Sequence, residues 1–124
     1  MSTNIILTTG TYDLIKDHIR RKKVNKEQEE ILTNELKYAQ QVLRKDLSDD
    51  IVSVGKKVKV KNHESNQEES YNFVGPDFAK PKKNRHSILS DIGVAIVGYK
   101  VGDTISWPSD LGEIKYEILS VENA

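Results

Sequence analysis

Charged side chains that could do chemistry gather near the N-terminus, where residues 20–30 read RRKKVNKEQEE. Glu27, Glu29 and Glu30 could offer carboxylate oxygens to a hard cation such as magnesium. Acidic residues in the first turn of a helix are also stabilised by the positive end of the helix dipole, which accounts for them without a metal. We therefore expect neither a metal site nor a catalytic residue in this stretch.

The neighbouring cations allow two interpretations. We call this segment the tip, and it consists of Arg21, Lys22, Lys23, Asn25 and Lys26. They could contact an acidic protein surface or nucleic-acid phosphates, or they could form a solvated helix end that favours the negative end of the dipole. A second basic run in a proline-containing loop, Lys80, Lys82, Lys83 and Arg85, has the same two interpretations. The formal net charge is zero, from 19 basic and 19 acidic side chains, so nucleic acid is expected to be only an indirect or weak partner.

Other kinds of reactive site are not supported by the residue pattern. The chain has no cysteine, which excludes disulfides and thiolate metal sites. His18, His63 and His86 are scattered without metal-ligand spacing, and no serine lies in a nucleophile-elbow pattern. The stretch 93–100 has Tyr99 where a phosphate-binding loop needs lysine. We expect a protein that is not an enzyme and has no cofactor or small-molecule substrate.

The N-terminal part is expected to form an antiparallel helical hairpin. Residues 4–7 predict an extended segment, and Thr8 or Thr9 is a plausible N-cap for an amphipathic helix that ends near Arg21. A second apolar stripe predicts a helix from Glu27 to near Lys45. The turn-rich residues 46–50 then break the pattern. We therefore predict two units, a hairpin over 1–47 and a second domain over 48–124, and an α+β fold class.

The sequence of the second unit predicts a sheet crossed by one helix. Strands are expected over 51–61, 70–74, 104–107 and 114–121, with polar or basic loops at 63–69 and 75–85. Ser90 or Asp91 can cap a short helix that buries Ile92, Ala95 and Ile96. Gly98 stands where the end of that helix needs a positive φ.

Two motifs in this unit carry a family resemblance. One is Ser87-Ile88-Leu89-Ser90-x-Ile92-Gly93, followed by Ala95, Gly98 and Val101-Gly102-Asp103; the other, upstream, is Tyr71-x-Phe73-Val74-Gly75-Pro76-Asp77. Together they resemble the C-terminal domain of the Gre-type transcription elongation factors, over roughly residues 51–121. Family members usually have proline where this chain has Asp91. The reduced hairpin is more similar to the relatives called regulator of nucleoside diphosphate kinase.

The resemblance implies a fold, a partner and a docking site. It implies an FKBP-like antiparallel sheet with one helix, and a regulator that docks on RNA polymerase near its secondary channel. The implied docking edge is Ser87, Leu89, Ser90 and Asp91. The cleavage factors of the family carry an acidic Asp-Leu-Ser-Glu-Asn-type motif at the hairpin tip, and no residue of this tip matches it. The resemblance therefore implies binding without transcript-cleavage activity.

Two alternatives to this function remain open from the sequence. The FKBP-like fold suggests peptidyl-prolyl isomerase activity, which would need aromatic side chains such as Phe73, Phe78 and Trp107 to line an open groove. The basic loops suggest a protein-interaction adaptor that acts without the polymerase. No apolar run has membrane-spanning length and no signal-peptide pattern begins the chain, so we expect a cytoplasmic protein without a membrane partner.

Overall fold

A computed structural model describes residues 5–109 and 112–123. The helices are α1 (Thr9–Arg20), α2 (Lys26–Tyr38) and α3 (Asp91–Ile96). The strands are β1 (Ile6–Thr8), β2 (Gln40–Val42), β3 (Lys56–Asn62), β4 (Gln67–Val74), β5 (Arg85–Ser87), β6 (Thr104–Ser109) and β7 (Gly112–Asn123). Three 3₁₀ turns, η1 (Arg44–Asp46), η2 (Pro76–Phe78) and η3 (Pro81–Lys83), lie in the connections. The α+β class is confirmed. Among the described residues, no helix is long and apolar enough to cross a membrane.

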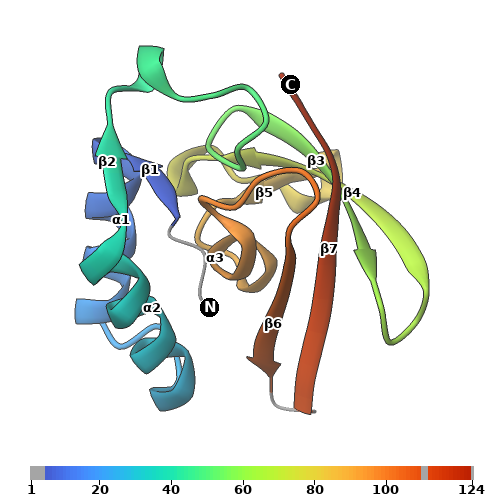
Figure 1. The fold of residues 1–124 in the computed structure, drawn as a ribbon, viewed down its shortest axis with the longest axis horizontal. Coiled ribbons are helices and arrows are strands. Elements are labelled where there is room, and N and C mark those ends of the chain that lie inside the picture. The colour runs from blue at the N-terminus through green and yellow to red at the C-terminus, as the bar shows by residue number, and fades with distance from the viewer. Residues whose placement is uncertain (1–4, 110–111, 124) are drawn as a thin grey trace.

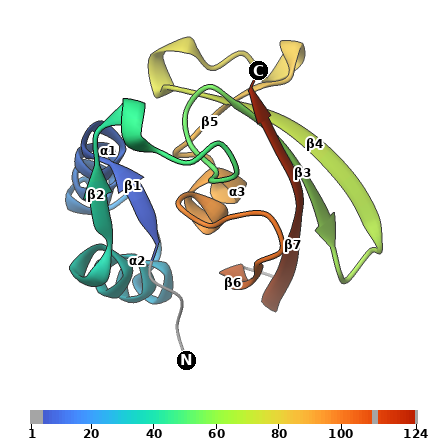
Figure 2. The same ribbon diagram turned by 45° about the horizontal axis from the view of Figure 1, so that its top comes forward.

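The larger sheet has the strand order β5-β4-β3-β7-β6. Its pairs are antiparallel except at one edge, where the short β5 runs parallel to β4. Alternation along β3 decides which face is buried, because Val58 and Val60 are fully buried while Lys57 and Lys59 are exposed. Figures 1 and 2 show α3 lying between this sheet and the helical hairpin. The helix therefore fills the space between the two parts of the chain.

The hairpin forms as predicted at its start but not at its end. Thr8 caps α1 by accepting a hydrogen bond from the backbone N–H of Thr11 (3.3 Å), and α1 ends at Arg20. The prediction that the second helix reaches Lys45 is wrong over residues 39–45. Ala39 is already extended, and Gln40 donates its N–H to the carbonyl of Ile5 (3.0 Å), so the chain pairs with β1 as the parallel strand β2. Leu43, predicted on the buried stripe, is 59% exposed as a result.

Several strand boundaries also differ from the sequence prediction. Residues 51–55 do not belong to β3, because Gly55 takes a φ of +87° and turns the chain before Lys56. Ile51 instead makes an isolated bridge with Lys100. The polar loop predicted at 63–69 is shorter than expected, since β4 begins at Gln67. β6 begins at Thr104 as predicted but continues to Ser109, and β7 is longer than predicted at both of its ends.

One hydrophobic core joins the two predicted units. It includes Ile5, Leu7, Ile15, Leu32 and Leu36 from the N-terminal part together with residues such as Val52, Phe73, Ile88, Ile96 and Trp107. Gly98, with a φ of +86°, permits the close approach of β1, because a Cβ there would lie 2.8 Å from the Cβ of Ile5. Polar contacts add to this junction, and Tyr99 donates its hydroxyl to Glu35 of α2 (2.8 Å). The division at residues 47 and 48 stays a prediction.

Candidate docking site

The predicted docking edge is held in place by a dense set of backbone contacts. Ile88 is fully buried and donates its N–H to the carbonyl of Val74 (2.9 Å). Ser87 Oγ accepts the N–H of Leu89 (3.0 Å), and Ser90 N–H bonds to the carbonyl of Ser87 (2.9 Å). The edge is therefore a tight turn whose geometry is fixed before any partner arrives.

The short helix α3 begins directly from this turn. Ser90 caps it by accepting the N–H of Gly93 (3.2 Å), which confirms one of the two predicted caps. Gly93 packs against the turn so closely that a Cβ there would lie 2.4 Å from the carbonyl oxygen of Ile88. Asp91, which stands where relatives usually have proline, occupies the first turn of α3 and is exposed. The turn and the helix thus form one rigid unit.

The edge forms one wall of a cavity of about 500 Å³. Ser87, Leu89 and Ser90 line it together with Pro76 and Asp77. The opposite wall comes from the helical hairpin and consists of Leu14, Asp17, His18, Arg21 and Lys23. Leu89 is partly buried, and its side chain both packs against the core and lines this cavity. The structure thereby brings three of the four predicted edge residues and two residues of the predicted tip segment to one site, whereas Asp91 does not line the cavity.

Three residues of the hairpin wall, Leu14, Asp17 and His18, were not predicted as part of a site. Asp17 binds both Arg20 and Arg21, the latter at 2.9 Å, and the hydrogen bond from Arg20 lowers the pKa of Asp17. Burial lowers the pKa of His18, nearby Lys23 lowers it further, and the carboxylates of Asp91 and Asp17 oppose the shift. His18 is therefore a neutral imidazole at pH 7. For Leu14 and His18 the sequence signal was their position beside the apolar stripe of the first helix.

The remaining tip residues have local roles. Lys22 pairs with Glu29 (3.6 Å), and Asn25 caps α2 in a reciprocal arrangement with Gln28. Asn25 Oδ1 accepts the N–H of Gln28 at 2.8 Å, so its side chain is already engaged. Lys22, Asn25 and Lys26 do not line the cavity. Within the part of the chain that the structure describes, no group of three or more His, Asp or Glu side chains could hold a metal ion.

The three aromatic residues named for an isomerase pocket do not converge. Phe73 is fully buried and Trp107 is 3% exposed, so both belong to the core. Phe78 lies in the loop after β4 and is 72% exposed. No open groove is formed by the three together.

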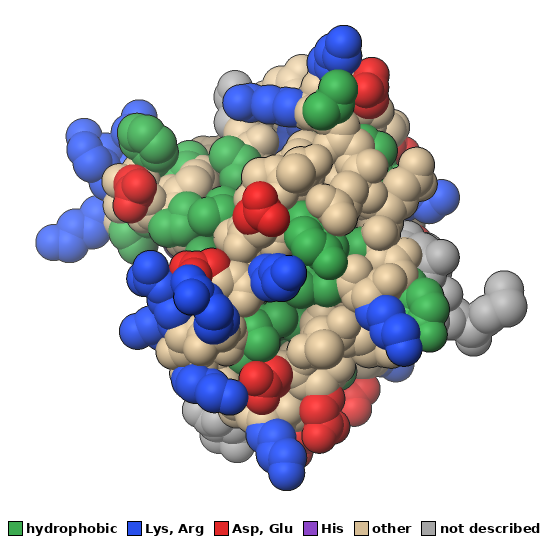
Figure 3. Space-filling model, turned by 90° about the vertical axis from the view of Figure 1, so that its left-hand side faces the viewer, with side chains coloured by type: hydrophobic (Ala, Val, Ile, Leu, Met, Phe, Trp, Pro, Cys, Tyr) green, Lys and Arg blue, Asp and Glu red, His purple; other side chains and the backbone are tan. Residues whose placement is uncertain are grey.

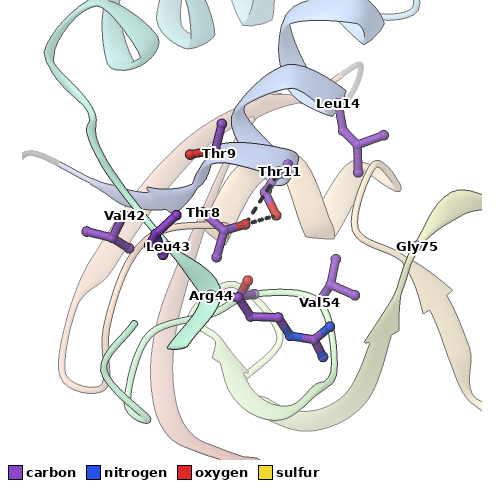
Figure 4. A pocket seen from close by; sticks show the side chains of 11 residues that line it. Thr8, Thr9, Thr11, Leu14, Val42, Leu43, Arg44, Val54 and Gly75 are labelled. Carbon is purple, nitrogen blue, oxygen red and sulfur yellow. Dashed lines mark hydrogen bonds between the residues drawn. The ribbon is translucent and has the colours of Figure 1, made fainter. Parts of the chain in front are cut away.

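A second cavity of about 590 Å³ lies on the other side of Leu14. Figure 4 shows Thr8 bonded to Thr11 at its rim and Arg44 extending toward Val54. The molecular face that carries the hairpin shows hydrophobic side chains with both basic and acidic side chains around them (Figure 3). No sequence prediction placed a functional residue in this cavity.

Comparison with known proteins identifies the family. The protein-family model described as "Transcription elongation factor, GreA/GreB, C-term" matches residues 47–123, a range that contains the whole predicted docking edge. The chain belongs to the GreA/GreB family. Transcription elongation factor GreA of Clostridium beijerinckii is 42% identical over 93 residues, which cover 75% of this chain and 58% of the relative. GreA of Clostridium botulinum strain Langeland is 44% identical over the same shares.

Structures of the same family share the fold. The transcription elongation factor GreA/GreB from Nitrosomonas europaea superposes with a TM-score of 0.69 at 21% identity, covering 98% of this chain and 99% of that one. Gfh1 of Thermus aquaticus superposes with a TM-score of 0.53 at 14% identity, covering 98% and 100%. The chain spans somewhat more than half the length of the GreA relatives that it matches. Family membership and the predicted resemblance are thus confirmed.

Proposed function

We propose that this GreA/GreB-family chain is a transcription regulator that docks on RNA polymerase near its secondary channel, through the edge formed by Ser87, Leu89, Ser90 and Asp91. The observation that carries the proposal is the family match over residues 47–123, which includes this edge. The relatives that support it are named transcription elongation factors. The regulator would act in the cytoplasm, where the polymerase works.

The geometry of the edge supports a docking role. Its turn is fixed by hydrogen bonds and by the buried Ile88, so little conformational entropy would be lost on binding. Leu89 offers an apolar side chain beside an open cavity, and buried apolar contacts supply much of the energy of protein interfaces. Asp91 adds an exposed carboxylate next to it. The cavity wall from α1 extends the contact surface to the hairpin.

We further propose that the chain does not stimulate transcript cleavage. The connection between α1 and α2 carries cations where the cleavage factors of the resemblance carry an acidic motif. Glu29, at the start of α2, is paired with Lys22. The helices are also short, about 18 Å and 20 Å for 12 and 13 residues at about 1.5 Å each, which supports the placement near the regulator of nucleoside diphosphate kinase branch.

The direct test uses the whole chain with purified bacterial RNA polymerase core enzyme. Binding is measured by biolayer interferometry, with GreA from a relative added as competitor. We expect saturable binding that GreA displaces, because both would use the same docking surface. Absence of binding, or binding that GreA leaves untouched, would overturn the proposed docking.

The cleavage half of the proposal has its own assay. A stalled elongation complex with a labelled transcript is incubated with magnesium and either this chain or GreA. We expect shortened transcripts with GreA and none above background with this chain. Shortening that is lost when Glu27 and Glu30 are both changed to alanine would show that the tip is catalytic after all.

A further inference from the structure

The loop between β4 and β5 carries an unusual concentration of unpaired charge. Lys80, Lys82, Lys83 and Arg85 are all exposed, and no ion pair among the described residues involves any of them. Asp77 is the one acidic residue of segment 76–85, so four cations face one carboxylate and the local net charge is +3. The whole chain has a formal net charge of zero. This loop is therefore a local electropositive feature that the fold leaves without internal compensation.

An exposed aromatic ring lies at the start of the same loop. Phe78 ends the turn η2 and is 72% exposed, more than any other exposed large hydrophobic side chain among the described residues. Such an exposed ring contributes little to the core and is costly to leave in water. Its position beside four unpaired cations places an apolar face and positive charge on one surface.

The loop is closed and ordered. Lys80 and Arg85 face each other in an antiparallel bridge, with Lys80 N–H to Arg85 carbonyl at 2.7 Å and the reverse bond at 3.1 Å. Pro81 begins η3, and Asn84 closes the turn in a left-handed conformation with a φ of 56°. The backbone that carries the cations is thus already organised, which lowers the entropic cost of binding a charged partner.

The register of the sheet continues this surface beyond the loop. Arg85 lies opposite Asn72, and Asn72 lies opposite Lys57, so the three occupy one row across β5, β4 and β3; the row continues to the acidic Glu122 on β7. Lys57 is exposed on the outer face and has no ion pair among the described residues. The next lysine on that face, Lys59, is paired with Glu68 (3.1 Å), so the unpaired positive surface ends there.

We propose that this surface, which consists of Phe78, Lys80, Lys82, Lys83, Arg85 and Lys57, binds single-stranded nucleic acid. Lysine and arginine would contact backbone phosphates, and Phe78 would stack on an unpaired base. A single strand presents both features at once, whereas the bases of a duplex are already stacked on each other. An acidic protein surface would also meet the cations, but it would not need Phe78 to stack on a planar base, so the effect of Phe78→Ala on single-strand binding separates the two occupants.

The proposed contacts predict weak binding without sequence preference. Non-specific affinities of this type are about 10⁻⁴ to 10⁻⁶ M at physiological salt, which agrees with a chain of zero net charge. Each neutralised phosphate of a single strand contributes about −0.7 to the slope of log K against log salt. Four to five contacts therefore predict a slope of about −3. The proposal depends on this surface alone and stands independently of polymerase docking.

The test is fluorescence anisotropy of the whole chain with labelled oligonucleotides of mixed sequence, about 16 nucleotides long. Three arms use single-stranded RNA, single-stranded DNA and a duplex of equal length, each over a series of salt concentrations. Comparing the RNA and DNA arms shows which single strand the surface prefers. The loop variant changes Lys80, Lys82 and Lys83 to alanine, and a second variant is Phe78→Ala. The matched control changes Lys22, Lys23 and Lys26 at the hairpin tip to alanine, which removes the same charge elsewhere.

We expect the loop variant to lose binding at least about tenfold and to reduce the salt slope by about 2, while the tip variant keeps the slope. Phe78→Ala should weaken single-strand binding by about 5- to 100-fold and leave any duplex binding unchanged. Equal losses in the two triple variants would overturn the proposal in favour of bulk charge. Duplex binding as tight as single-strand binding, or no effect of Phe78→Ala, would overturn the stacking contact. No binding to any oligonucleotide at low salt would overturn it entirely and leave an acidic protein as the occupant.

Discussion

The docking edge and the hairpin tip face the same cavity but are built differently. The edge is anchored by Ile88, which is fully buried, and its serines hold the backbone in a fixed turn. The tip is exposed, and Arg21 and Lys22 are paired with Asp17 and Glu29. A basic sequence run can therefore be partly neutralised by its own neighbours, whereas a rigid turn can offer the side chains of Leu89 and Asp91, which are unpaired among the described residues. The comparison favours the edge as the binding element.

The largest expected difference between the two regions is in packing. Ile88→Ala should destabilise the fold by about 2–5 kcal/mol, because it leaves a cavity in the core beneath the edge. Val24→Ala, at the partly buried tip valine, should cost about 1 kcal/mol or less. Chemical denaturation of both variants measures the difference. Equal losses would mean that the tip is anchored as firmly as the edge.

The next effect concerns the junction that holds the hairpin beside α3. Burial raises the pKa of Glu35 to about 7, against the opposing hydrogen bond from Tyr99. Because the folded pKa lies above the unfolded value, the protonated form favours folding. This contribution is complete below about pH 4.5 and is lost as the pH rises through 7, on the order of 2–3 kcal/mol.

Glu35→Gln should remove most of that pH dependence, since the amide oxygen can still accept the Tyr99 hydroxyl. Thermal melts at pH 5 and pH 8 check this. We expect the wild-type chain to lose more stability than the variant between the two values. Parallel losses in both proteins would show that Glu35 does not titrate in this range.

Two helix caps, one in each region, provide matched variants whose expected effects on stability are intermediate. Ser90 caps α3 at the edge and Asn25 caps α2 at the tip, each through a side-chain oxygen. Ser90→Ala and Asn25→Ala should each cost about 1 kcal/mol in stability. Polymerase affinity should separate them, because only Ser90 belongs to the proposed edge. If Asn25→Ala weakened polymerase binding more than Ser90→Ala at equal stability, the tip rather than the edge would be the binding element.

The smallest effect on stability should come from the charges of the tip. Changing Lys22, Lys23 and Lys26 together to alanine should alter the unfolding free energy by less than about 1 kcal/mol. The three side chains are exposed, and Lys22 forms the one ion pair among them within the described residues. Urea denaturation at low and high salt measures the change. A larger loss would reveal a structural role for the basic tip.

Local sequence signals predicted the parts of the fold that local physics controls. The caps at Thr8 and Ser90, the positive φ of Gly98 and the alternation of Val58 and Val60 were all available from residue type and spacing. The C-terminal end of the hairpin was not predictable in this way. Residues 39–43 continue the apolar spacing of a helix. In the fold, however, the backbone N–H of Gln40 bonds to the carbonyl of Ile5 and the chain pairs with β1. This pairing joins segments that are distant in sequence, so no local pattern predicts it.

The candidate site was predicted only in part. The edge residues came from motifs that are contiguous in sequence, and Arg21 and Lys23 came from the basic run. That Asp17 and His18 face the edge depends on how α1 packs across the cavity, which is a tertiary contact. The two basic runs looked equivalent in sequence. The structure separates them, because Asp17 and Glu29 form ion pairs with the basic run at the hairpin, and among the described residues no ion pair involves the cations at 80–85.

Polymerase affinity of edge and tip variants, measured beside their thermal stability, tests the central claim most directly. Leu89→Ala and Asp91→Arg alter the edge, and the triple alanine variant of Lys22, Lys23 and Lys26 alters the tip. Asp91 is exposed, so Asp91→Arg keeps the test valid even if Leu89→Ala lowers the melting temperature. We predict at least about fivefold weaker binding for the edge variants and less than about threefold for the tip variant. Full binding by both edge variants, with loss only in the tip variant, would contradict the account and move the interface to the hairpin.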